Sequence, residues 1–317
     1  MYDLVIKGAV VADGTGASLR TADVAVKDGH IAEVGRITGA TTETVDADGL
    51  VLAPGIVDVH THYDAQLTWD SNATPSPSLG VTTVVVGNCG FSIAPCPPEC
   101  RDLIARNLAE VEGMSLTALR SGTNWDFETF DEYLTLLKRK GVTPNVAAFI
   151  GHSAVRTMVM GPEASERAAR EDEVLEMRDL VSGGMDAGAV GFSTSTSINH
   201  YGDGGVPMPS RLAEESELRS LVGVLGEKGR GVFQLTVGPN MTSEVMESLA
   251  KDNNCPVFQT AALFNEADPE RAPKMVSDSA EAQERGNQLW AQVSCQSLSM
   301  DFSLTAAFPM QSLDAWR

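Results

Sequence analysis

From Val51 onward the chain repeats one unit, in which an apolar stretch and a polar loop precede an amphipathic segment closed by glycine. Helical spacing marks residues 127–140, 167–181 and 214–228, which stop at Gly141, Gly183-Gly184 and Gly229. Strand, helix and strand in repeated order predict right-handed crossovers in a parallel sheet. The apolar runs that read as strands are residues 51–59, 81–86, 145–150, 187–192, 231–237, 256–263 and 289–295.

The fold class predicted from this repeat is α/β, and a (β/α) barrel fits it best. About seven of the eight barrel strands can be counted in the sequence, so the barrel is expected to be incomplete. An open doubly wound sheet is the alternative. It lacks the Gly-rich phosphate loop that marks its nucleotide-binding form.

Residues 1–52 have a different pattern. Short apolar runs alternate with the turn dipeptides Asp13-Gly14 and Asp28-Gly29, which predicts a small β-rich unit. A sheet of three or four short strands rarely stands alone, so it should pack on another element. We therefore divide the chain into an N-terminal β segment, 1–52, and a barrel domain, 53–317.

Charge and cysteine usage exclude several classes of protein. The net charge of −20 argues against nucleic acid and anionic membranes as partners. No basic leader opens the chain, and no apolar run approaches the ~20 residues of a membrane span, so we expect a cytoplasmic protein. A homo-oligomer remains open. An odd count of five cysteines makes a disulfide framework improbable. Cys96 and Cys100 are a metal half-site or, more simply, two unpaired thiols.

The first barrel strand ends in His60-Thr61-His62. Side chains two residues apart on a strand point to the same side, so both imidazoles should project together and reach one metal ion. The apolar run before them reads as a strand covered on both faces. The alternative is two unrelated histidines, each satisfied by backbone or water.

Polar residues follow the other strands as well. Since the C-terminal ends of barrel strands meet at one rim, we expect active-site groups there. Cys89, in a Gly-Asn-Cys-Gly turn, is a thiolate ligand or a small buried hydrophobe, and the nearby histidine pair favours the ligand. His152 and His200 are candidates for binding the metal, orienting the substrate or supporting a metal ligand. Asp58 would brace a ligand or face the barrel floor. The remaining candidates at this rim are Tyr63, Asp64, Ser153 and Ser193.

Several motifs carry a resemblance to a known family. The segments YDLVIKGAVVADGTG, DADGLVLAPGIVDVHTHYDAQ, GVTTVVVGNCGFSIAP, GHSAVR and GAVGFSTS resemble the amidohydrolase superfamily, in its N-acyl-D-amino-acid deacylase (D-aminoacylase-like) branch. This resemblance implies a metal-dependent barrel with a flanking β-sandwich, one or two Zn²⁺ ions, and a small-molecule amide substrate. His60 and His62 match the strand-one metal pair. Cys89 matches the cysteine that replaces a carboxylated lysine as ligand.

The lysines count against one group of relatives, and the sequence departs from the D-aminoacylase branch at two points. None of the seven lysines ends strand four, which counts against cyclic-amide hydrolases such as hydantoinases and dihydroorotases. Gln234, Thr236 and Gln259 stand where the family carries metal-binding histidines after strands five and six, and amides are poor substitutes on zinc. The family's strand-eight aspartate would lie beyond Arg317, so the catalytic residue is unknown. We therefore expect a C-terminally truncated relative.

The function predicted is metal-dependent hydrolysis of a linear, non-peptide amide such as an N-acyl-D-amino acid. A bound zinc lowers the pKa of water from about 16 toward 7 and polarises the carbonyl, while a carboxylate carries the proton to the leaving nitrogen. Arg156 and Arg211 are candidates for the guanidinium that holds a substrate carboxylate. The alternatives are an inactive barrel that binds a ligand or partner, and a cyclic-amide hydrolase.

Overall fold

The computed structural model describes residues 1–266, 268–297 and 299. The chain forms two compact units, Met1–Ile56 and Val57–Arg317. Within the described ranges, no helix combines the length and the apolar character needed to cross a membrane.

The N-terminal unit is a five-stranded sheet. Its strands are β1 Tyr2–Val11, β2 Arg20–Lys27, β3 His30–Gly35, β4 Thr41–Asp46 and β5 Val51–Leu52. They are ordered β3-β2-β1-β4 with β5 on β1, and β1 runs antiparallel to β2 but parallel to β4 and β5. The predicted turn Asp28-Gly29 joins β2 to β3 with positive φ angles of 52° and 74°, as a tight hairpin requires.

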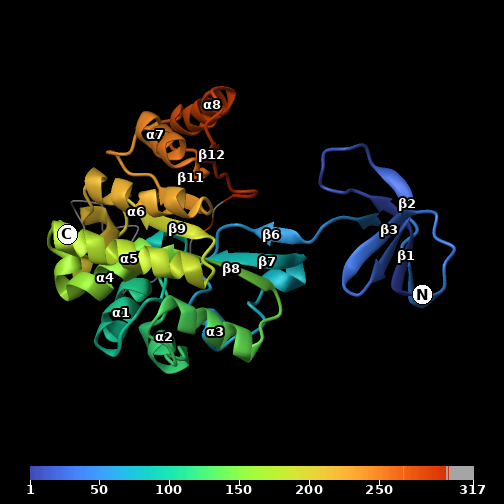
Figure 1. Cartoon of the computed structure of the whole chain (residues 1–317), viewed down its shortest axis with the longest axis horizontal. Coiled ribbons are helices and arrows are strands. Elements are labelled where there is room, and N and C mark those ends of the chain that lie inside the picture. The colour runs from blue at the N-terminus through green and yellow to red at the C-terminus, as the bar shows by residue number, and fades with distance from the viewer. Residues whose placement is uncertain (267, 298, 300–317) are drawn as a thin grey trace. The chain divides into compact units, whose positions relative to one another are not determined.

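The second unit is built on a seven-stranded sheet in chain order (Figure 1). Its strands are β6 Ile56–Asp58, β7 Val81–Val86, β8 Asn145–Gly151, β9 Gly191–Ser195, β10 Val232–Thr236, β11 Val257–Thr260 and β12 Leu289–Ala291. The pairs from β7 to β12 are parallel. Among the described residues, β6 and β12 are the two ends of this sheet. The unit is an incomplete (β/α) barrel, and the predicted fold class is confirmed.

Helices connect the strands. They are α1 Arg101–Val111, α2 Leu116–Gly122, α3 Phe130–Lys140, α4 His152–Met160, α5 Glu171–Ala187, α6 Glu215–Lys228, α7 Ser243–Asn253 and α8 Arg271–Glu284. Short 3-10 helices lie at Gln66–Thr68, Ser76–Leu79, Asn88–Gly90, Pro98–Cys100, Gly161–Ser165, Asp203–Gly205 and Pro209–Leu212. A capping box of Thr129 and Glu132 starts α3, and Gly229 ends α6 in the left-handed conformation.

Two predicted elements differ from the structure. The run 51–59 is not one buried strand: β5 joins the N-terminal sheet and β6 joins the barrel sheet. Val57 and Val59 are 52% and 45% exposed, because β6 is an end strand and has only one neighbour among the described strands.

The helix predicted to stop at Gly183-Gly184 continues to Ala187 as α5 and ends at Gly188, whose φ is 116°. The glycine pair therefore does not end the helix. A Cβ at Gly184 would lie 2.5 Å from Cδ1 of buried Ile150, so this glycine lets α5 pack closely against β8. Strand β9 consequently begins at Gly191, later than predicted.

Candidate metal centre

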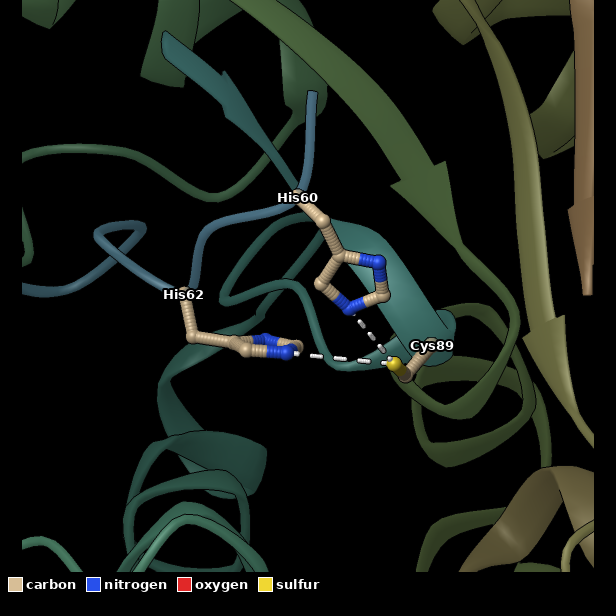
Figure 2. Close-up of side chains that lie close together, drawn as sticks. All are labelled: His60, His62 and Cys89. Atoms are coloured by element: carbon tan, nitrogen blue, oxygen red, sulfur yellow. Dashed lines mark hydrogen bonds between the residues drawn. The ribbon is translucent and has the colours of Figure 1, made fainter. Parts of the chain in front are cut away.

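Two imidazoles and one thiol converge at the edge of the barrel sheet (Figure 2). His60 and His62 follow β6, and Cys89 follows β7. The Sγ atom of Cys89 lies 3.2 Å from Nε2 of His60 and 3.8 Å from Nε2 of His62. The possible ligand atoms of the three residues all lie within 4.8 Å of one another. Both rings therefore face the same sulfur, and a single metal ion placed between the three residues could be bound by all of them.

The sharp turn after β7 orients the Cys89 side chain. Gly87 and Gly90 have φ angles of 77° and 78°, and Cys89 between them has 58°. A left-handed conformation is unfavourable for a residue with a Cβ and is often kept for function. A side chain at Gly87 would place its Cβ 2.3 Å from the carbonyl oxygen of Phe149, so only glycine fits there.

Three side chains hold this turn by accepting hydrogen bonds from three of its backbone N–H groups. Asp64 accepts from Gly87, Gln234 accepts from Cys89 and Ser193 accepts from Gly90, at 3.0, 2.7 and 3.0 Å. All three side chains are buried. Asp64 and Ser193 were predicted to contact substrate or support the site, and the structure places them behind the turn. Burial raises the pKa of Asp64 to about 7.

The protonation states of the cluster suit a metal site. Burial lowers the pKa of both histidines, His62 especially, so the rings are neutral at pH 7. Burial also raises the pKa of the Cys89 thiol far above its usual range, so this thiol ionises only beside a cation. Neutral imidazole and thiolate are ligands that zinc accepts. The residues present therefore fit a zinc ion.

Two residues near the cluster escaped the sequence reasoning. Oε1 of Glu112, just after α1, lies 3.6 Å from Nδ1 of His62, and burial raises the pKa of this carboxyl group to about 8. Oε1 of Gln292, just after β12, lies 3.2 Å from Nδ1 of His60. No local pattern marks either residue, because each reaches its histidine only through the tertiary fold.

The candidates that follow β8 lie in a buried network. His152 is fully buried, and its Nε2 donates to Oε1 of Glu217 at 2.7 Å. Nδ1 of His152 and the Thr194 hydroxyl are 2.8 Å apart. The Ser153 hydroxyl accepts from the backbone N–H of Ser210 at 3.3 Å. His152 and Ser153 thus lie in the protein interior with protein partners.

Arg156 belongs to the same buried network. Its Nη1 donates to both carboxylate oxygens of Glu217, at 2.6 and 2.5 Å, and its side chain is 0% exposed. Its guanidinium thus already pairs with a carboxylate inside the protein, whereas the predicted role is to hold a substrate carboxylate.

His200 and Arg211 lie together after β9. Nδ1 of His200 is 2.7 Å from the Ser195 hydroxyl, and burial together with the charge of Arg211 lowers the His200 pKa to about 4. Arg211 donates to the His200 carbonyl at 2.9 Å and stacks on the Tyr201 ring. The Phe91 ring lies 4.9 Å from the His200 ring and 6.0 Å from the His62 ring, centroid to centroid. His200 thus borders the cluster without joining it.

The remaining predicted residues have local partners. Asp58 accepts from the backbone N–H of His60 at 3.4 Å, and the Tyr63 hydroxyl pairs with Ser76 at 2.9 Å. Cys96 and Cys100 are buried free thiols whose pKa values are raised by burial, for Cys96 to about 12. In the described part of the chain, they belong to no group of possible metal ligands.

Comparison with known proteins gives a consistent result. Residues 43–312 match the pattern of the family described as the Amidohydrolase family. The D-aminoacylase of Alcaligenes xylosoxydans xylosoxydans is 40% identical over 198 residues, which are 61% of this chain and 37% of that protein.

Two solved structures share the fold. A crystal structure of D-aminoacylase superposes with a TM-score of 0.74 at 28% identity, covering 93% of this chain and 58% of the other. The N-acyl-D-glutamate deacylase of Bordetella bronchiseptica, complexed with zinc and a phosphonate inhibitor, gives 0.68 at 28% identity, covering 91% and 57%.

The chain thus spans between about a third and three fifths of the length of these relatives. The family match nevertheless extends over most of the chain and includes His60, His62 and Cys89. This protein belongs to the amidohydrolase family.

Proposed function

We propose that the chain carries the metal centre of a zinc-dependent hydrolase that cleaves linear amides of the N-acyl-D-amino-acid class. The observation that carries the proposal is the convergence of two imidazole Nε2 atoms on the Cys89 thiol. The similarity of the chain to proteins named D-aminoacylase and N-acyl-D-glutamate deacylase supports the substrate class. The zinc in the solved structure of N-acyl-D-glutamate deacylase supports the choice of metal.

The protein's own residues prepare the site for the metal. His60 and His62 present neutral rings, and Cys89 gives up its proton when a cation binds. The turn from Gly87 to Gly90 fixes the direction of the sulfur. When bound, zinc supplies Lewis-acid chemistry, lowering the pKa of water and polarising the amide carbonyl. The carboxyl group of Glu112 lies 3.6 Å from Nδ1 of His62, and burial raises its pKa to about 8.

Recognition of the substrate carboxylate falls to Arg211. It is one of the two arginines predicted for this role. Arg211 is half-buried next to His200, which borders the ligand cluster. A guanidinium in that position can pair with a carboxylate by two parallel hydrogen bonds.

The proposal is tested by metal content and substrate range. Purified protein, reconstituted with zinc, is analysed for bound metal and assayed on N-acetyl-D-amino acids, their L-enantiomers and cyclic amides. We expect one or two zinc ions per chain and turnover of the D-series alone. The matched control is His30→Ala, which changes an exposed histidine in β3. Full activity in a His60→Ala/His62→Ala double variant would contradict the proposal, as would ring opening of cyclic amides.

A further inference from the structure

A chain of hydrogen bonds joins the Cys89 turn to the far nitrogen of His60. It runs through side chains of three neighbouring strands: Gln234 in β10, Thr260 at the end of β11, and Gln292 just after β12. We propose that these three are positioning residues that keep the proton of His60 on Nδ1. The Nε2 lone pair of His60 then faces the metal position.

A backbone N–H group sets the donor and acceptor roles along this chain of hydrogen bonds. The backbone N–H of Cys89 can only donate, so the group that faces it at 2.7 Å must be the carbonyl oxygen of the Gln234 amide. The NH₂ group of Gln234 consequently points the other way, and it donates to the Thr260 hydroxyl oxygen at 2.9 Å. Gln234 is fully buried, so water does not compete for these bonds.

The donor and acceptor roles of Thr260 and Gln292 determine which nitrogen of His60 carries the proton. Because the Thr260 oxygen already accepts from Gln234, its own proton is available to Oε1 of Gln292. The Gln292 oxygen is then an acceptor, and the His60 Nδ1 beside it at 3.2 Å must be the donor. A neutral imidazole carries one proton, which leaves Nε2 unprotonated and 3.2 Å from the Cys89 sulfur.

Reversal of the Gln292 amide would break this order. Its NH₂ group would then face both Thr260 and His60, so the Thr260 oxygen would meet two donors while its own proton lost its acceptor. Thr260 is only 9% exposed, and an unpaired buried proton is unfavourable. The backbone of Gln292 is held on both sides, by Gln259 at 2.9 Å and Ala262 at 2.8 Å, which fixes where its side chain begins.

This arrangement gives a role to Gln234 on strand five and Thr260 on strand six, whereas the Gln259 amide donates to the Ser279 hydroxyl at 2.8 Å. Amides are poor replacements for metal-binding histidines. Gln234 does not need to bind metal in this arrangement. Its bond from the Cys89 N–H group fixes the orientation of its amide, and through Thr260 and Gln292 this sets the proton position on the ligand His60. Partners that hold the second nitrogen of a ligating histidine typically contribute about 10–100-fold to metal affinity.

The first measurement needs no metal. Nitrogen-15 NMR of the metal-free protein, labelled at histidine and assigned with His60→Asn, reports which nitrogen of His60 carries the proton. We expect the Nδ1–H form in the wild-type protein. In Gln292→Met the acceptor is lost, and the Nε2–H form should appear. Gln292→Glu retains an acceptor and should keep Nδ1–H. The matched control, Gln288→Met, changes an amide just before β12 and should keep the wild-type form.

The second measurement is zinc affinity, by competition with a chromophoric chelator. We expect Gln292→Met to weaken zinc binding by about 10–100-fold and Gln292→Glu to restore it. Thr260→Val should weaken binding as well, since it cuts the chain one step earlier. An Nε2–H form of His60 in the wild-type protein would overturn the inference, as would unchanged zinc affinity in Gln292→Met.

The zinc part of this test rests on the proposed function, whereas the NMR part does not. A wild-type protein that shows Nδ1–H at His60 but binds no zinc would refute the hydrolase proposal and leave the positioning role of the three side chains supported.

Discussion

The buried pair of Arg156 and Glu217 gives a sharp prediction about stability. Arg156 is 0% exposed and Glu217 3% exposed, and two hydrogen bonds of 2.6 and 2.5 Å join them. Arg156→Met keeps most of the side-chain volume and removes the charge. Removing one partner of a buried ion pair costs about 3–5 kcal/mol, because the other charge stays buried and unpaired. Among the described residues, only His152 would then donate to the carboxylate through a side chain.

The assay is urea unfolding followed by far-UV circular dichroism, on metal-free protein so that zinc does not add to stability. A loss of about 4 kcal/mol lowers the folding equilibrium constant by about three powers of ten and should shift the midpoint strongly. The double variant Arg156→Met/Glu217→Gln removes both charges and should recover most of the loss. A single variant within about 1 kcal/mol of wild type, with only KM raised, would refute the structural assignment and restore Arg156 to substrate binding.

The pair also predicts a pH dependence. Burial alone would raise the pKa of Glu217, but the His152 hydrogen bond and the Arg156 charge outweigh it and lower the pKa. A lowered carboxyl pKa stabilises the fold above the pKa of the unfolded chain, and that stabilisation is lost as the pH falls through the folded pKa. Wild-type stability should therefore decline on acidification. The double variant, which lacks this carboxyl group, should lose less over the same range.

Three further predictions concern the helix α5, the ligand cluster and the substrate. Gly184→Ala should destabilise the protein by about 1–3 kcal/mol, because its Cβ would press on Ile150. In the control Gly183→Ala the new Cβ meets nothing within 4 Å, so this variant should stabilise the helix by about 0.5–1 kcal/mol. Equal unfolding midpoints for the two variants would contradict this account. Cys89→Ser should purify with less than stoichiometric zinc by elemental analysis, and full occupancy would remove the thiol from the ligand set. Arg211→Met should raise KM for N-acyl-D-amino acids but not for N-acyl amines without a carboxylate; a similar change for both would exclude carboxylate recognition.

The sequence alone determined the order of elements and the class of fold. Apolar runs and helical periodicity are local properties, so they identified the seven barrel strands, although β9 begins later than predicted and β6 is short. The His-x-His pair and the Gly-bounded Cys89 were also visible, because strand alternation and tight turns act within a few residues. These short-range rules suffice to say that two imidazoles leave one strand together.

Tertiary structure alone decided which side chains complete the cluster. Gln292 meets His60 across 232 positions, a contact that exists only once β12 has taken its place and register in the sheet. The same holds for Glu112 beside His62 and for the burial of Arg156 against Glu217. Exposure of Val57 and Val59 follows likewise from the position of β6 at an end of the sheet. Local preferences carry no information about such neighbours, because register and packing depend on the whole chain at once.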